Sequence, residues 1–245
     1  MSYSRRRGNE NNFSLNIIDE GSMNLYTKSL VLLLASCSAF TLPALAGDSA
    51  ANRGSSSLLL AVQPVGIHVP TLIAPPLQLG YFITGDFVVG LSSGSASVNQ
   101  DEGNAKSSAS FKDSGVWFRY FTGNSFNFLL GYNKRSWTAD ATVSETQYTS
   151  TYGYQTATAT AGLTADATVA TIGLANHWTF DGGFTLGVDW LLGSSVLSSS
   201  TTTNITTNAG VNSTTLDNDL NTLADTLNKI SGLGGLTVLT LGWAF

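Results

Sequence analysis

The chain has 245 residues, a formal net charge of −5, 42% hydrophobic residues and only 11% charged residues, whereas soluble domains carry about 25% charged residues. The acidic balance argues against nucleic-acid binding, which a basic stripe would signal. After Ala46 no apolar run approaches the roughly 20 residues of a membrane-spanning helix. Apolar residues instead alternate with Thr, Ser, Asn and Gly, a pattern typical of strands that cross a membrane.

Residues 23–46 have the three parts of a secretory signal peptide. Lys28 supplies the positive charge, and residues 29–40 form a short apolar core. Ala44 and Ala46 form an A-x-A cleavage site directly before Gly47. We therefore expect the mature chain to begin at Gly47.

Two features of the N-terminal region leave alternatives open. The segment that ends at Cys37 also fits a lipobox, in which case this cysteine would be lipidated. Cys37 is the only cysteine of the chain, so a mature chain cleaved after Ala46 has no disulfide. Residues 1–22 do not fit the leader, because their arginines lie far from the apolar core. We expect them to be a non-native extension, with translation beginning at Met23.

The mature chain is predicted to hold a short linker over 47–56 and a β-barrel domain over 57–245. All five prolines lie before residue 77, and long continuous strands exclude proline. The first predicted strand, 57–68, alternates well but is interrupted by Pro64. Alternation of period two predicts seven further strands, over 77–83, 87–92, 116–121, 126–133, 172–180, 184–192 and 239–245.

Short and long connections are expected to follow one another along the chain. Short turn signals with Gly beside Asp or Asn occur at 84–86, 122–125 and 181–183, where a positive φ is tolerated. Long Ser/Thr/Asn-rich segments at 99–113, 138–164 and 198–232 are predicted as loops. Transmembrane barrels have tight periplasmic turns and long outer loops. Residues 138–172 keep alternating, which predicts a projecting β-hairpin.

One segment follows the helical period instead. Between residues 216 and 230, leucine and isoleucine recur at three- and four-residue spacing, which predicts a short amphipathic helix in the last long loop. Thr215 is the expected N-cap and Gly232 the expected stop. The apolar stripe could lie on the outer leaflet, dip into the barrel mouth, or pair with another copy.

Because alternate residues of a strand face opposite sides, several polar residues are expected to face the barrel interior. An eight-stranded barrel is just wide enough for side chains to fill, and buried charges need partners. We expect Arg119 and Arg135 to pair with Asp189 or with Asp113 and to plug the lumen. The alternative is that they line a narrow pore. The same side holds Gln63, Gln78, Asn127, Asn133 and His177.

The outer face carries two further signals. Lys134 falls on the lipid side near the expected outer interface, where its side chain can extend toward lipid phosphates. It is either a packing residue or a lipopolysaccharide contact. Aromatic residues near the tight turns and the C-terminus are expected to form a girdle at the inner interface: Phe87, Tyr120, Phe126, Phe180, Phe184, Trp243 and Phe245.

The last strand has apolar residues at alternate positions, Leu239, Leu241, Trp243 and Phe245, with small residues between them. It resembles the C-terminal strand of Gram-negative outer-membrane proteins. With the leader and the turn pattern, residues 57–245 resemble the small eight-stranded barrels of the OmpA, OmpX and OmpW type. The resemblance implies a closed antiparallel transmembrane barrel in the outer membrane, recognised by the barrel assembly machinery through this strand.

No cofactor or metal is expected. His177 and Thr179 faintly resemble the His-x-Ser of barrel lipid A deacylases, but Thr replaces Ser and no carboxylate near them in the sequence completes the set. We therefore predict a non-enzymatic barrel with a structural or surface-interaction role, in contact with outer-membrane lipid and lipopolysaccharide and open to a surface ligand. The alternatives are a small solute channel and, less favoured, a lipid-modifying enzyme.

Overall fold

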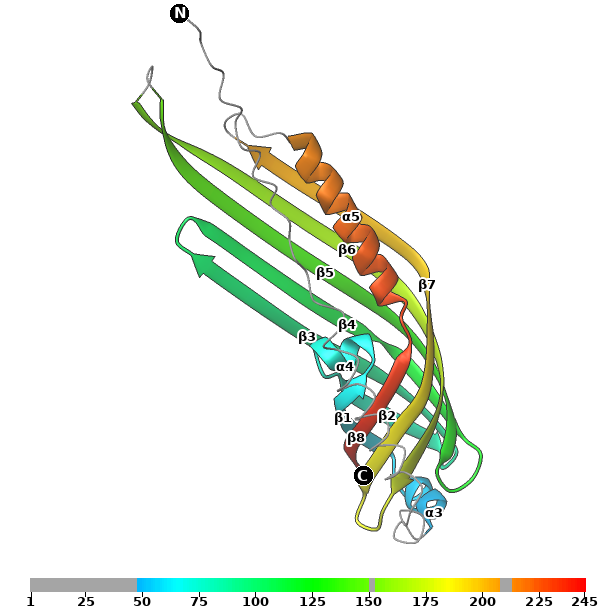
Figure 1. Ribbon diagram of the computed structural model, residues 1–245. Coiled ribbons are helices and arrows are strands. Elements are labelled where there is room, and N and C mark those ends of the chain that lie inside the picture. The colour runs from blue at the N-terminus through cyan, green and yellow to red at the C-terminus, as the bar shows by residue number, and fades with distance from the viewer. Residues whose placement is uncertain (1–47, 150–152, 208–212) are drawn as a thin grey trace, which may run out of the picture. The chain divides into compact units, whose positions relative to one another are not determined.

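Eight antiparallel strands close into one barrel in which each strand pairs with its neighbours in the chain and β8 pairs with β1 (Figure 1). The computed structural model describes residues 48–149, 153–207 and 213–245. It confirms the predicted fold class. The expected signal peptide with Ala44 and Ala46, the lipobox alternative at Cys37 and the extension 1–22 lie outside these residues. None of the described helices is long and apolar enough to cross a membrane.

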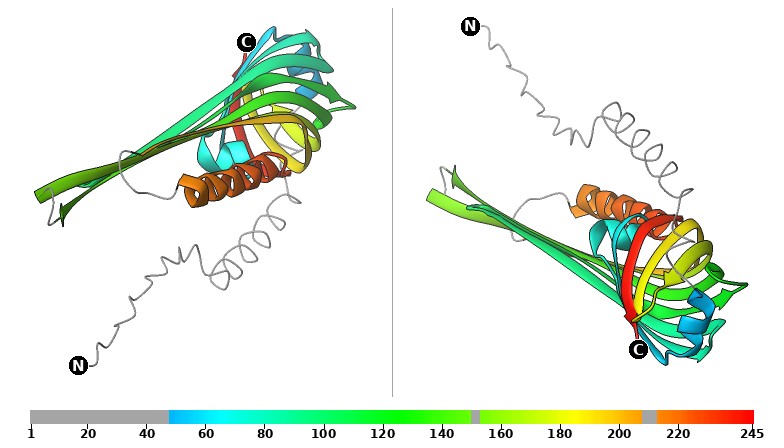
Figure 2. Two further views of the ribbon diagram at one scale, coloured as in Figure 1. Left: turned by 90° about the horizontal axis from the view of Figure 1, so that it is seen from above. Right: turned by 90° about the horizontal axis from the view of Figure 1, so that it is seen from below.

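The strands differ greatly in length. Three short strands, β8, β1 and β2, close the ring, while five long strands continue beyond it as an open curved sheet (Figures 1 and 2). The short strands are β1 Leu58–Ile67, β2 Leu77–Thr84 and β8 Gly235–Ala244. The long strands are β3 Phe87–Glu102, β4 Ala105–Phe121, β5 Phe126–Thr149, β6 Gly153–Thr179 and β7 Phe184–Thr207.

The long segments predicted as loops are therefore mostly strand, which corrects that prediction. Residues 99–102 and 105–113 extend β3 and β4, and 198–207 extend β7. The predicted hairpin over 138–172 is present, paired without a break between β5 and β6. The apolar alternation stops where the outer face becomes Ser and Thr, but Thr keeps a strong preference for strands. The end of the hydrophobic pattern was not the end of the strand.

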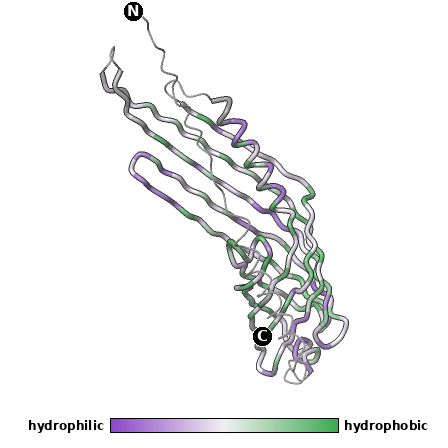
Figure 3. Tube along the Cα trace, in the orientation of Figure 1, coloured by the Kyte–Doolittle hydropathy of each residue, from purple (hydrophilic) through white to green (hydrophobic). Residues whose placement is uncertain are grey.

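The outer face of the ring is apolar and the outer face of the projecting sheet is polar. In register across β2 to β5, Leu79, Leu91, Val116 and Tyr132 form an exposed row. One step further from the tight turns, the row of Ser93, Ser114, Lys134 and Thr168 is polar. Figure 3 shows more of the hydrophobic residues around the ring than in the projecting hairpins.

Strand β1 is irregular at its proline. Its pairing with β8 breaks register between Val62 and Val65, at Pro64, because proline cannot donate a ladder hydrogen bond. Leu59 and Ala61 still face the interior as expected from their alternation. The strand predicted over 57–68 is therefore present as β1, with Pro64 placed at a bulge.

Three described helices occupy the ends of the barrel. Helix α3, Ser49–Gly54, replaces the linker predicted over 47–56 and lies against the tight turns. Helix α4, Val69–Ile73, connects β1 to β2. Helix α5, Ser213–Ser231, covers the predicted helix 216–230 but begins earlier, so Thr215 lies inside its first turn. It ends directly before Gly232, as predicted.

Helix α5 covers part of its apolar stripe against the barrel, while Leu223 stays 43% exposed. It contacts β6 and β7 on the inner face of the projecting sheet (Figure 2). Ala224 is buried, and Ile230 packs against the cluster of Val69, Ala74 and Phe111. Of the three places considered for this helix, its C-terminal end takes the barrel mouth, and the rest of the helix lies along the projecting sheet.

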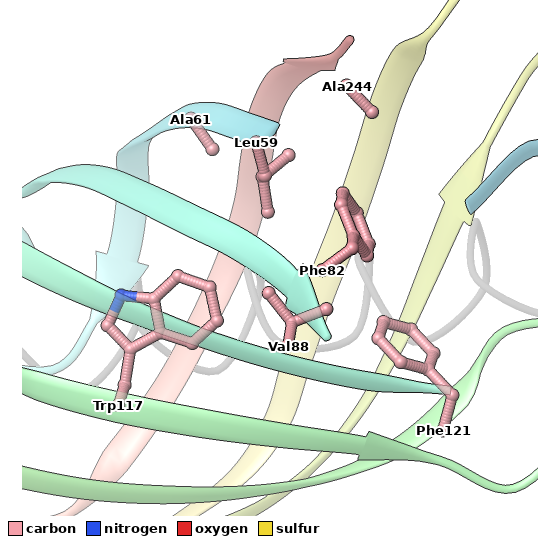
Figure 4. Close-up of a cluster of buried hydrophobic side chains, with 7 residues drawn as sticks. All are labelled: Leu59, Ala61, Phe82, Val88, Trp117, Phe121 and Ala244. Atoms are coloured by element: carbon pink, nitrogen blue, oxygen red, sulfur yellow. The ribbon is translucent and has the colours of Figure 1, made fainter. Parts of the chain in front are cut away.

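The apolar core lies in the ring near the tight turns. Figure 4 shows its side chains converging from β1, β2, β3, β4 and β8: Leu59, Ala61, Phe82, Val88, Trp117, Phe121 and Ala244. On the outside, the expected aromatic girdle forms ring contacts between Phe180 and Phe184 and between Phe184 and Trp243. The ring is thus packed on its inside and apolar on its outside.

Candidate functional site

The lumen is the candidate site, and helix α3 covers its end at the tight turns. Arg53 is buried and donates to the carbonyls of Gly85, Gly123 and Asn124 at 2.9, 2.9 and 2.6 Å. Its guanidinium lies 3.8 Å from the centre of the Phe121 ring. Burial lowers the pKa of Arg53 to about 10, so the side chain remains a cation at neutral pH.

Sequence reasoning missed this cap. The available signal was Asp48, whose carboxylate accepts a hydrogen bond from the Ala51 amide at 3.1 Å as a helix N-cap. Ser49 adds a second anchor, since its hydroxyl accepts from the Thr179 amide at 2.7 Å. A six-residue helix with few apolar residues has no period long enough to stand out.

The first polar layer of the lumen is centred on Asp189. This carboxylate is fully buried and binds Arg119 through both of its oxygens, at 2.7 and 3.1 Å. Gln63 donates to it at 2.9 Å, and His177 lies 2.9 Å away through Nε2. Arg119 also donates to Asn127 at 3.0 Å. Four strands, β1, β4, β6 and β7, thereby meet on one buried charge.

The second polar layer lies further from the tight turns and is centred on Arg135. It pairs with Asp113 at 3.0 Å, and both side chains are nearly fully buried. Asn133 donates to the same carboxylate at 2.9 Å. Arg135 also donates to the Ser231 carbonyl at the end of α5 and lies 3.2 Å from His68. This arginine therefore ties the barrel wall to both connections at the mouth.

The two layers separate the alternatives that the sequence left for the arginines. Arg119 pairs with Asp189, and Arg135 pairs with Asp113. Between the layers lies a cavity of about 50 Å³ with both polar and apolar lining residues. Gln78, which is 6% exposed, lines it together with Asn133. Beyond the second layer, Val69, Phe111, Trp137 and Ile230 form an apolar cluster.

Four buried side-chain atoms of the described residues have no hydrogen-bond partner: Arg119 Nε, Thr237 Oγ1, Trp178 Nε1 and Asn228 Oδ1. Asp189 and Thr237 are paired in register between β7 and β8, so the orphan hydroxyl lies beside the first polar layer. The charged groups of the two polar layers are nevertheless all paired, Arg119 with Asp189 and Arg135 with Asp113.

The enzyme alternative gains a carboxylate, but the hydroxyl of Thr179, which stands in the place of the serine, is buried. Asp189 on β7 supplies the acid that was not visible near His177 in the sequence. Thr179, however, lies 3.5 Å from Thr185 through its hydroxyl, and it is 1% exposed beneath α3. Among the described residues no group of three or more His, Cys, Asp or Glu side chains could hold a metal ion.

The expected assembly signal lies on the outer face of β8. Trp243 and Phe245 are 48% and 64% exposed there, and Leu239 and Leu241 are half-buried. The Trp243 indole donates to the Gly182 carbonyl at 2.8 Å. The Phe245 amide donates to the Leu58 carbonyl at 2.8 Å, so the last residue belongs to the seam between β8 and β1.

No protein-family model matches the chain, and no curated protein matches it. Two solved structures are similar. CarO2 of Acinetobacter baumannii is 12% identical with a TM-score of 0.41, and CarO of Acinetobacter baumannii is 8% identical with a TM-score of 0.39. Each likeness covers 78% of this chain and 98% of the other. Neither assigns a role to this chain.

Proposed function

We propose that the protein is a non-enzymatic β-barrel of the Gram-negative outer membrane with a structural or surface-interaction role. The observation that carries the proposal is the filled lumen. Helix α3 covers one end, two paired arginines cross the middle, and α4, α5 and their apolar cluster occupy the other end. A solute would have to displace buried ion pairs, which are costly to break singly.

The location in a membrane is supported by the outer face. Rows of exposed Leu, Val, Phe and Tyr side chains surround the ring, and such large apolar surfaces are unusual in soluble monomers. A closed barrel also leaves no unpaired backbone groups in lipid. The tight turns, the terminal Phe245 and the aromatic girdle share one end of the barrel, which we assign to the periplasmic side.

The surface role is supported by the projecting sheet. From Lys134 to Thr149, β5 extends about 50 Å along its own direction beyond the apolar rows. Both edges of the sheet are open in the described part of the chain, because β3 is no longer paired with β2 beyond Ser93 and β7 is no longer paired with β8 beyond Leu192. Open edges can accept a strand from a partner.

Planar-bilayer conductance tests the proposal, with protein purified from the outer membrane of an expressing Gram-negative host. We expect no discrete openings from the native protein. Removing only the second-layer ion pair, with Arg135→Ala and Asp113→Ala together, is expected to leave the barrel silent, because the Arg119–Asp189 pair and helix α3 still close the lumen. Reproducible openings of the native protein that change in Arg135→Ala would favour the small channel instead. Recovery of the protein from another membrane fraction would refute the location.

A further inference from the structure

We infer that the outer wall of the barrel carries a binding site for a phosphorylated glycolipid of the outer leaflet, formed by Lys112 and Lys134 above an apolar groove. The inference rests on the proposed function, because it requires the projecting sheet to stand on the outer side of the membrane. It names a lipid partner for a surface that faces away from the lumen.

The groove lies where the apolar rows end. It has a volume of about 500 Å³ and runs over β2, β3, β4 and β5. Leu77, Leu79, Leu91 and Val116 line its apolar part, and each is at least 36% exposed. Ser93, Ser114 and Lys134 line its other end. A lipid chain fits the first part, and a hydrated headgroup fits the second.

The two lysines stand at neighbouring places on this border. Lys134 is opposite Ser114, and Lys112 is opposite Ser136, so the lysines are diagonal neighbours, which lie about 7–8 Å apart in an ordinary antiparallel pair. Both are exposed. Within the described residues neither lysine forms an ion pair, whereas Lys106, at the end of the same sheet, is paired with Asp101 at 3.1 Å.

The charge of the two lysines and their position at the polar border indicate which ligand the groove would bind. Two like charges on adjacent strands disfavour each other, and an anion between them removes this repulsion. Lysine binds phosphate as a point charge, and the neighbouring serine hydroxyls can donate to its oxygens. Asp166 is opposite Ser136. Its negative charge repels a bound phosphate and so weakens binding. A lipid with phosphate on a sugar headgroup and several acyl chains matches both halves of the groove.

The test measures binding of diphosphorylated lipid A to the purified protein in detergent by native mass spectrometry. Replacing both lysines, with Lys112→Gln and Lys134→Gln, is expected to weaken binding at least about tenfold, because each removes a charge-assisted contact. Asp166→Asn is expected to strengthen binding. Lys106→Gln is the matched control and should leave affinity unchanged. Heat-dependent gel mobility checks that each variant is folded.

Two further probes fix the chemistry. Dephosphorylated lipid A is expected to bind as weakly to the native protein as lipid A binds to the double variant. Phosphatidylglycerol, which has one phosphate and no sugar, is expected to bind more weakly than lipid A. Equal binding of either probe, or an equal loss in Lys106→Gln, would overturn the inference. Because conductance is measured separately, a silent barrel that ignores lipid A refutes this site and leaves the proposed function intact.

Discussion

The pairing of Arg119 with Asp189 makes the clearest prediction about how the lumen is stabilised. Asp189→Asn keeps the shape of the side chain and removes its charge. Arg119 would then be a buried cation without a carboxylate, because the other acid of the lumen, Asp113, is held by Arg135 and Asn133. Removing one partner of a buried ion pair costs about 3–5 kcal/mol of unfolding free energy.

The size of the loss can be separated from general damage by a double-mutant cycle. Arg119→Met alone leaves a buried carboxylate with only Gln63 and His177, and we expect a similar loss. The double variant lacks both charges, so neither is left buried without a partner. Its loss of unfolding free energy should therefore be smaller than the sum of the two single-variant losses by about 2–3 kcal/mol. Asp140→Asn on the exposed outer face of β5 is the control and should change little.

The assay is urea unfolding of the protein in phospholipid vesicles, followed by tryptophan fluorescence and by gel mobility. Single variants within about 1 kcal/mol of the native protein would refute the idea that this pair is desolvated. Additive losses in the cycle would show that Arg119 and Asp189 act on stability independently, with no coupling free energy between them.

Three further predictions concern the cap, the wall and the last strand. Arg53→Met removes the donors that hold α3 to the turn carbonyls, so proteinase K should cut residues 49–56 at least about tenfold faster, while Ser55→Ala should be cut at the native rate. Gly90→Ala places a Cβ against the Trp117 indole and the Leu79 carbonyl and should cost about 1–3 kcal/mol in the same urea assay; Gly193→Ala, whose nearest atom is 3.6 Å away, should not. Phe245→Ala should lower the amount of folded barrel in the outer membrane, measured by heat-modifiable gel mobility of membrane fractions, and Phe245→Tyr should restore it; an unchanged amount in Phe245→Ala would argue against the assembly signal.

Strand positions in the ring were predictable because the two sides of the wall differ there in polarity. Leu77, Leu79 and Tyr81 face outward while Gln78 and Gly80 face inward, so the period of two is visible in the letters. Beyond the polar border this contrast fades. Thr156, Thr158 and Thr160 alternate with alanine, and hydropathy alone does not distinguish such a strand from a polar loop.

The interior was predictable in part. Parity placed Arg119, Arg135 and Asp189 on one side, but their pairing depends on how far neighbouring strands are offset. Asp189 sits at a register break, between the Gly187–Thr240 and Leu192–Gly235 pairs with β8 and beside a second break against β6. A bulge changes which side chains lie opposite one another, and the pattern of residues in the sequence does not predict where this bulge lies. The contact between Asp189 and His177, by contrast, is a diagonal one within the regular part of the β6–β7 pair, where Ala175 is opposite Asp189 and His177 is opposite Gly187.

The unequal regularity of the strand pairs has a consequence for the order of assembly. β5 and β6 follow one another in the chain and pair without interruption over the whole length of β5, so we expect their contacts, which are local, to form early. The seam is different, since β8 has two register breaks with β7 and two with β1. Ring closure therefore comes last, and amide exchange should be slowest in β5 and β6 and fastest along β8.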